Sequence, residues 1–251
     1  HVASTLESLA AVLRAKGDYA EAETLLRETL AIRRKVYGND HPYVGSTLVW
    51  LGALLRDKGD YAAAEPPLRE ALALYRSRLG DDHPHIASSA SNLARLLYDK
   101  GDYDEAERHF AEALEIYRKR LGNEHPHVGH PLLGLGRVYL ARGHAERAEP
   151  LLHEVLVIWR KALPEDDWLT ASAESVLGES LVALDRYQEA EPLLLRSYSA
   201  IEDVRGPDDR YARAGLQRIV ELYEAWDKPE KAAEYRAMAL RSPSQARPAD
   251  A

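Results

Sequence analysis

The chain has 251 residues, of which 45% are hydrophobic and 29% are charged, and its formal net charge is -8. This composition is typical of a soluble globular protein, and the negative charge argues against nucleic acid as a partner. The sequence contains no cysteine, which excludes disulfides, thiol catalysis and cysteine-ligated zinc, and this fits a reducing, cytoplasmic location. No apolar run approaches the ~18 residues that cross a bilayer, so no membrane partner is expected.

A sequence repeat of 42 residues organises the chain. Its clearest mark is a glycine at positions 17, 59, 101 and 143, and the same step then falls on Asp185 and Asp227. A fixed period of this size is typical of stacked helical units, which usually present a surface rather than a catalytic pocket. We predict one solenoid over residues 1–241, with repeats at 1–40, 41–82, 83–124, 125–166, 167–208 and 209–241.

The first half of each repeat is predicted to be a helix. In the second repeat Leu48, Leu51 and Leu55 recur at the spacing of one helical face. A small residue within this stripe, such as Gly52, would let a neighbouring helix approach closely. The helix should end at the repeated glycine, because glycine adopts positive φ at the least cost.

The second half of each repeat is also predicted to be a helix, starting just after that glycine. Its expected N-caps are Asp18, Asp60 and Asp102. The residues expected to complete capping boxes are Glu21, Glu105 and Glu189. Prolines occur inside this helix, where each should cause a kink: Pro66, Pro150 and Pro192.

The two ends of the chain differ from the middle. The last repeat is degenerate around Trp226 and Pro229, as expected of a terminal cap. Residues 242–251, SPSQARPADA, are polar and rich in proline, and we expect a disordered tail. At the other end, His1-Val2-Ala3-Ser4 aligns with a position inside a repeat, so we expect the natural chain to extend upstream.

The repeat motif resembles that of the tetratricopeptide repeat family. A first helix containing Leu-Gly or Leu-Ala is followed by Gly-Asp-Tyr-x-x-Ala-Glu, and the 42-residue length with a His-Pro link resembles the long variety of kinesin light chains. The stretch LGDDHPHIASSASNLARLLYDKGDYDEAE carries this likeness most clearly. The last third is similar to segments that close such arrays behind the kinase domain of bacterial serine/threonine kinases. The resemblance implies an all-α, right-handed solenoid of about six antiparallel helix pairs.

The resemblance also implies a ligand site, because the first helices of this family line a concave groove. Arginine and aromatic side chains commonly anchor interfaces, and a guanidinium suits carboxylates. We therefore expect an extended peptide with acidic and bulky apolar residues to bind in the groove, mainly across repeats 2 to 4. The groove residues carried over by register are Arg14, Val49, Trp50, Arg56, Ser91, Asn92, Arg95, Tyr98, Leu133 and Arg137.

Two alternatives concern the groove residues themselves. Its arginines could be solvated or could pair with nearby acids, as Arg56 could with Asp57 or Asp60. Trp50 could be buried between helices of the first two repeats rather than exposed.

The histidines raise the question of a metal site. His41, His83 and His125 recur with the repeat, but packed helices lie about 8–10 Å apart. Zinc needs nitrogen donors at ~2 Å, so we interpret these histidines as hydrogen-bonding groups of the turns. His127 and His130 lie closer to His125, yet no carboxylate is clearly placed beside them. We expect no catalytic, cofactor or metal site.

The leading hypothesis is therefore a non-catalytic protein-interaction scaffold. One alternative is an intramolecular regulatory region of a larger signalling enzyme, such as a bacterial serine/threonine kinase. Another is self-association through an exposed terminal repeat, because a stack that stops within a repeat leaves an apolar end uncovered.

Overall fold

The computed structural model describes residues 2–165 and 167–241, and within them the regular structure is entirely helical. The predicted tail at 242–251 lies outside the described residues. The helices are α1 Val2–Lys16, α2 Tyr19–Tyr37, α3 Pro42–Lys58, α4 Tyr61–Leu79, α5 Pro84–Lys100, α6 Tyr103–Leu121, η1 Pro126–Val128, α7 Gly129–Ala141, α8 Ala145–Ala162, α9 Trp168–Ala183, α10 Tyr187–Arg205, α11 Arg210–Ala225 and α12 Pro229–Arg241.

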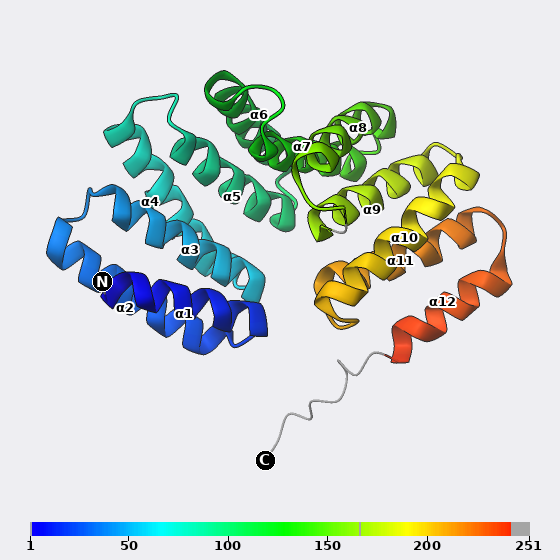
Figure 1. Cartoon of the computed structure of the whole chain (residues 1–251), viewed down its shortest axis with the longest axis horizontal. Coiled ribbons are helices and arrows are strands. Elements are labelled where there is room, and N and C mark those ends of the chain that lie inside the picture. The colour runs from blue at the N-terminus through cyan, green and yellow to red at the C-terminus, as the bar shows by residue number, and fades with distance from the viewer. Residues whose placement is uncertain (1, 166, 242–251) are drawn as a thin grey trace, which may run out of the picture. The chain divides into compact units, whose positions relative to one another are not determined.

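Each predicted repeat contains one helix pair, from α1 and α2 in the first to α11 and α12 in the last (Figure 1). The two helices of each pair pack against each other. Pairs follow one another in chain order, since α2 packs on α3, α4 on α5, α8 on α9 and α10 on α11. First helices also meet, as α3 does with α5 and α9 with α11. The predicted all-α helix-pair solenoid is confirmed.

The chain divides into two compact units, one ending at Asn123 and one beginning at Glu124. The first unit contains α1 to α6, and the second contains η1 and α7 to α12. The division falls in the link between the third and fourth repeats. That the whole chain forms one continuous solenoid stays a prediction.

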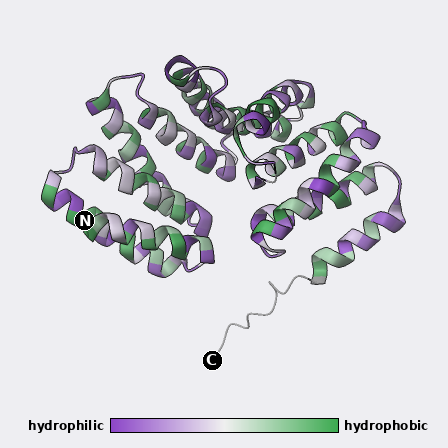
Figure 2. Cartoon of the chain, in the orientation of Figure 1, coloured by the Kyte–Doolittle hydropathy of each residue, from purple (hydrophilic) through white to green (hydrophobic). Residues whose placement is uncertain are grey.

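Apolar stripes hold each unit together. Polar and apolar residues alternate around the helices, as Figure 2 shows. In α3 the predicted stripe of Leu48, Leu51 and Leu55 is buried. A Cβ added to Gly52 would lie only 2.4 Å from Cγ of Leu68 in α4, so a small residue is required there. This confirms that the small position lets the paired helix approach closely.

The glycine turns have the backbone that the sequence predicts. Gly59 and Gly101 end α3 and α5 with φ of 87° and 84°, in the left-handed region. In the fifth and sixth repeats Asp185 and Asp227 take the same place with φ of 58° and 54°. The repeat thus keeps its backbone geometry after the glycine is lost.

The histidine ladder caps the first helices. The Nδ1 atoms of His41 and His83 each accept a bond from the backbone N–H two residues later, both at 3.1 Å. His125 does the same for His127 at 3.2 Å. Where His-Pro is lost, Asp167 and Asp209 accept the equivalent bond at 2.8 Å. The interpretation of these histidines as hydrogen-bonding groups of the turns is confirmed.

The second helices are capped less uniformly than predicted. Asp60 and Asp102 accept bonds from Ala63 and Glu105 N–H groups, whereas Asp18 occupies the N-cap without a side-chain bond. The expected capping boxes are not what the glutamates form. The carboxylate of Glu105 binds Arg69 of α4, and that of Glu189 binds Arg186. The helices also continue through their internal prolines at positions 66, 150 and 192.

Candidate functional site

Trp50 is the most exposed large aromatic residue among the predicted groove residues. It lies in the middle of α3 in the first unit, and 42% of its surface is accessible. The guanidinium carbon of Arg14, on α1, lies 6.0 Å from the centre of the tryptophan ring, within reach of a cation–π interaction. The structure thus brings two predicted residues together and rules out the alternative that Trp50 is buried.

The arginines beside Trp50 are held by acidic residues. Arg14 donates from Nε to Asp57 at 2.8 Å, and Arg56 donates to the other oxygen of the same carboxylate at 2.7 Å. Nε of Arg56 also lies 3.6 Å from Asp99 of α5. Burial raises the pKa of Asp57, but the charges of the two arginines outweigh it and hold that pKa below its usual value. Arg14, Asp57, Arg56 and Asp99 therefore form an alternating row of charges from α1 through α3 to α5.

Arg56 corrects one part of the predicted site. Only 3% of it is exposed, so its guanidinium serves the two aspartates rather than a ligand. The alternative pairing of Arg56 with Asp57 is the one observed. Ser91 of α5 is likewise buried and does not line an open surface.

The other groove residues of the first unit are half-buried: Val49, Asn92, Arg95 and Tyr98. Asn92 uses its amide nitrogen to donate to the Ser88 carbonyl at 2.9 Å, which leaves its side-chain oxygen as an acceptor. The ring of Tyr98 lies 5.6 Å from that of Tyr103. These side chains add apolar and polar surface on α3 and α5.

Leu133 and Arg137 belong to α7 in the second unit. Leu133 is buried, so it does not contribute an exposed apolar contact. Arg137 is half-buried and donates to the Ser172 hydroxyl of α9 at 3.3 Å. Within its own unit Arg137 therefore faces the next first helix.

The sequence analysis missed the aspartates that neutralise the arginines. Asp57 and Asp99 are 42 residues apart, in the related segments RDKG and YDKG. Their place just before the turn glycine was the available signal. It also missed Arg33 of α2, which is buried and binds both carboxylate oxygens of Glu7 at 2.5 and 2.6 Å. This pair fastens α1 to α2.

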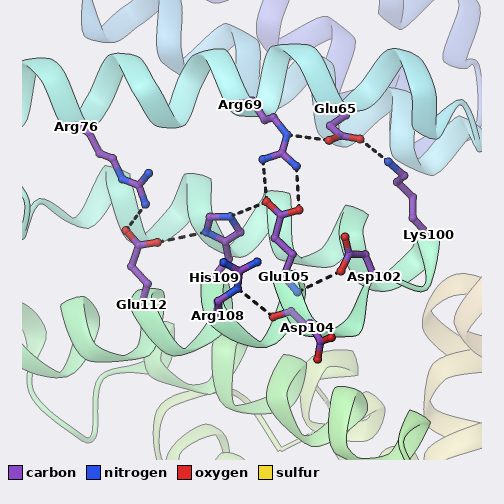
Figure 3. Close-up of polar contacts among 10 residues, drawn as sticks. All are labelled: Glu65, Arg69, Arg76, Lys100, Asp102, Asp104, Glu105, Arg108, His109 and Glu112. Carbon is purple, nitrogen blue, oxygen red and sulfur yellow. Dashed lines mark hydrogen bonds and ion pairs between the residues drawn. The ribbon is translucent and has the colours of Figure 1, made fainter.

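A network of ion pairs joins the second helices α4 and α6 (Figure 3). Arg69 binds Glu65 of its own helix and both oxygens of Glu105 on α6, at 2.7 to 3.0 Å. The Lys100 ammonium and Arg69 together hold the pKa of Glu65 below its usual value. Beside it, His109 of α6 lies between Glu105 and Glu112. Each carboxylate already has a cationic partner, so this cluster is a structural clamp rather than an acid–base site.

Two further searches cover the described residues only. Among residues 2–165 and 167–241, no group of three or more His, Asp or Glu is placed to hold a metal ion. None of the helices in that part of the chain has the length and apolarity needed to cross a bilayer.

Solved structures with similar folds include other repeat proteins. A Podosopora anserina putative kinesin light chain with nearly identical TPR-like repeats matches with a TM-score of 0.63 and 26% identity, over 81% of this chain and 98% of that one. BtubC (BKLC) from P. vanneervenii matches with a TM-score of 0.66 and 24% identity, over 82% and 83% of the two chains. Pseudomonas aeruginosa pilF matches with a TM-score of 0.59 and 19% identity, over 96% and 91%, and shows likeness of fold alone.

Sequence comparison leads to the same assignment. No curated protein matches the chain significantly. The family model described as tetratricopeptide repeat matches four overlapping or successive stretches, at residues 1–77, 43–119, 85–161 and 169–242. These stretches cover most of the sequence and follow the helix pairs of the structure. The chain therefore belongs to the tetratricopeptide repeat family.

Proposed function

We propose that the chain is a non-catalytic protein-interaction scaffold whose first unit binds an extended peptide across α1, α3 and α5. The single observation that carries this proposal is the exposed Trp50 in the middle of α3. Tetratricopeptide repeats generally mediate protein–protein interactions, and an accessible tryptophan on a rigid helix is a typical interface anchor. The proposed location is the cytoplasm, which suits a chain without cysteine.

The surroundings of Trp50 suggest what the peptide presents. The tryptophan offers a flat apolar surface for a bulky apolar side chain. Arg14 stands beside it with a quarter of its side chain exposed, and Asp57 fixes its position. A guanidinium held in this way can also bind a peptide carboxylate. We propose a motif in which an apolar residue lies next to an acidic one.

The charge row makes the acid preference secondary to the apolar contact. Arg14 and Arg56 carry two positive charges, and Asp57 and Asp99 carry two negative ones, so the row as a whole is neutral. A neutral surface attracts an acidic peptide weakly over long range. We therefore expect most of the binding free energy to come from Trp50 and little change of affinity with salt.

The test is selection of peptides from a random displayed library on the full chain, followed by affinity measurements with the selected peptides. We expect Trp50→Ala to weaken binding about 30-fold, which corresponds to the ~2 kcal/mol of an interface hot spot. Tyr37→Ala is the matched control, because Tyr37 is a similarly exposed aromatic residue on the second helix α2. Equal loss in both variants, or peptides that bind the Trp50→Ala chain normally, would show that the site lies elsewhere.

A further inference from the structure

An uncovered apolar stripe runs along α1. Val2, Thr5, Leu9 and Val12 share one face of this helix, and the exposed fractions of the three apolar members are 64%, 45% and 52%. We define these four residues as the α1 stripe. Three large apolar side chains exposed in a row on one helix mark a surface that gains free energy when it is covered.

The repeat shows what this face does elsewhere in the chain. One step of 42 residues from the α1 stripe leads to Val44, Thr47, Leu51 and Leu54 of α3, with exposed fractions of 0 to 3%. A second step leads to Ile86, Ser89, Leu93 and Leu96 of α5, which are exposed by at most 1%. There α2 packs on α3 and α4 packs on α5. The α1 stripe is thus the same helix-packing surface without its covering helix.

The exposed face of α1 is uncharged. The exposed side chains between Val2 and Ala15 are those of valine, leucine, alanine, serine and threonine. The two charged residues of this stretch turn inward, where Glu7 pairs with Arg33 and Arg14 pairs with Asp57. Two identical copies of this face can therefore meet without like-charge repulsion. Serines at positions 4 and 8 keep its edge small.

The last helix pair offers no matching surface for a head-to-tail contact. In α12, Arg236 stands at the register position of Leu68 and Leu194, both of which are fully buried. Arg236 pairs with Glu224, and Glu230, Lys231 and Glu234 are exposed along the same helix. Covering the α1 stripe with α12 would bury these charges at a cost.

We propose that the α1 stripe binds the α1 stripe of a second copy of this chain, giving a two-fold symmetric dimer. A self-complementary apolar face fits an isologous contact, in which the same residues lie on both sides. This contact uses α1 alone, so it does not depend on peptide binding at Trp50.

The test measures the mass of the full chain by light scattering over a range of concentrations. We expect the wild type to approach twice the chain mass of 28.1 kDa as concentration rises. The double variant Leu9→Glu with Val12→Glu should stay at the monomer mass, because pairing would bury four carboxylates. The matched control is Val157→Glu with Val204→Glu, since both valines are exposed on second helices, and it should dimerise as the wild type does.

Further arms separate other occupants of the stripe. Leu9→Gln with Val12→Thr removes the apolar surface without adding charge, and circular dichroism checks that each variant keeps its helices. Leu240→Glu in α12 should leave the dimer intact, and its dissociation would indicate head-to-tail assembly and overturn the proposal. A wild type that stays monomeric at every concentration would overturn it as well. If such a monomer melted at higher temperature after a copy of residues 41–82 was added before α1, the stripe would instead bind another helix pair.

Discussion

The two units build the same helix pair from different residues at equivalent positions. In the first unit a glycine makes the left-handed turn before α4 and α6, whereas Asp185 and Asp227 make it in the second unit. In the first unit a histidine nitrogen caps α3 and α5, whereas a carboxylate caps α9 and α11. The comparison teaches that the repeat requires a backbone geometry and a hydrogen-bond acceptor, not one residue type.

The units also bury charge in opposite ways. In the first, the guanidinium of Arg56 is buried beside two partly buried aspartates. In the second, the carboxylate of Glu174 is buried while its partners Arg160 and Arg196 each expose more than half of the side chain, 54% and 58%. A buried charge needs its partners, whereas an exposed arginine keeps its interaction with water. The two sites should therefore respond differently when one member is removed.

Removal of these buried charges should give the largest effect. We expect Arg56→Ala to lower the free energy of unfolding by about 3 kcal/mol, because it leaves Asp57 and Asp99 partly buried with less compensation. Glu174→Ala should cost about 1 kcal/mol or less, since Arg160 and Arg196 can turn to solvent. Urea unfolding of both variants measures the difference. Equal losses would show that the exposure of the partners does not govern the cost.

Helix contact distances give an intermediate effect. Gly52→Ala in the first unit places a methyl group 2.4 Å from Leu68, and we expect it to lower the free energy of unfolding by about 1–3 kcal/mol. Gly215→Ala in the second unit meets no atom closer than 3.7 Å. It should raise stability by about 0.5–1 kcal/mol, because alanine favours helix more than glycine does. Thermal unfolding of the pair checks both signs, and a loss in Gly215→Ala would contradict this account.

The turn residues give the smallest effect. Gly101→Asp should destabilise the chain, and Asp227→Gly should stabilise it, each by about 1 kcal/mol, because a residue with a Cβ is strained at positive φ. Chemical denaturation of the two variants and of the double exchange would show whether the changes cancel. If both single variants lost stability, the aspartate would have a role in the second unit beyond the backbone conformation.

Much of the architecture follows from the sequence alone. The 42-residue step places the helix pairs because apolar residues at helical spacing and turn glycines are local signals. The His-Pro links were correctly read as turns, since a proline in the first turn and a side-chain acceptor before it act within a few residues. The capping role of Glu105 was wrong, because Arg69, from the preceding repeat, binds its carboxylate instead.

The candidate site depended on the tertiary structure. Sequence register placed Arg14, Trp50 and Arg56 on first helices, but it could not decide which of them reach the surface. Exposure depends on how neighbouring helices pack, and this packing buries Arg56 between two aspartates while it leaves Trp50 accessible. The sequence by itself determined the repeat, the helices and the family. Only the packing of one helix pair on the next decided which charges are paired and which apolar faces, like that of α1, remain open.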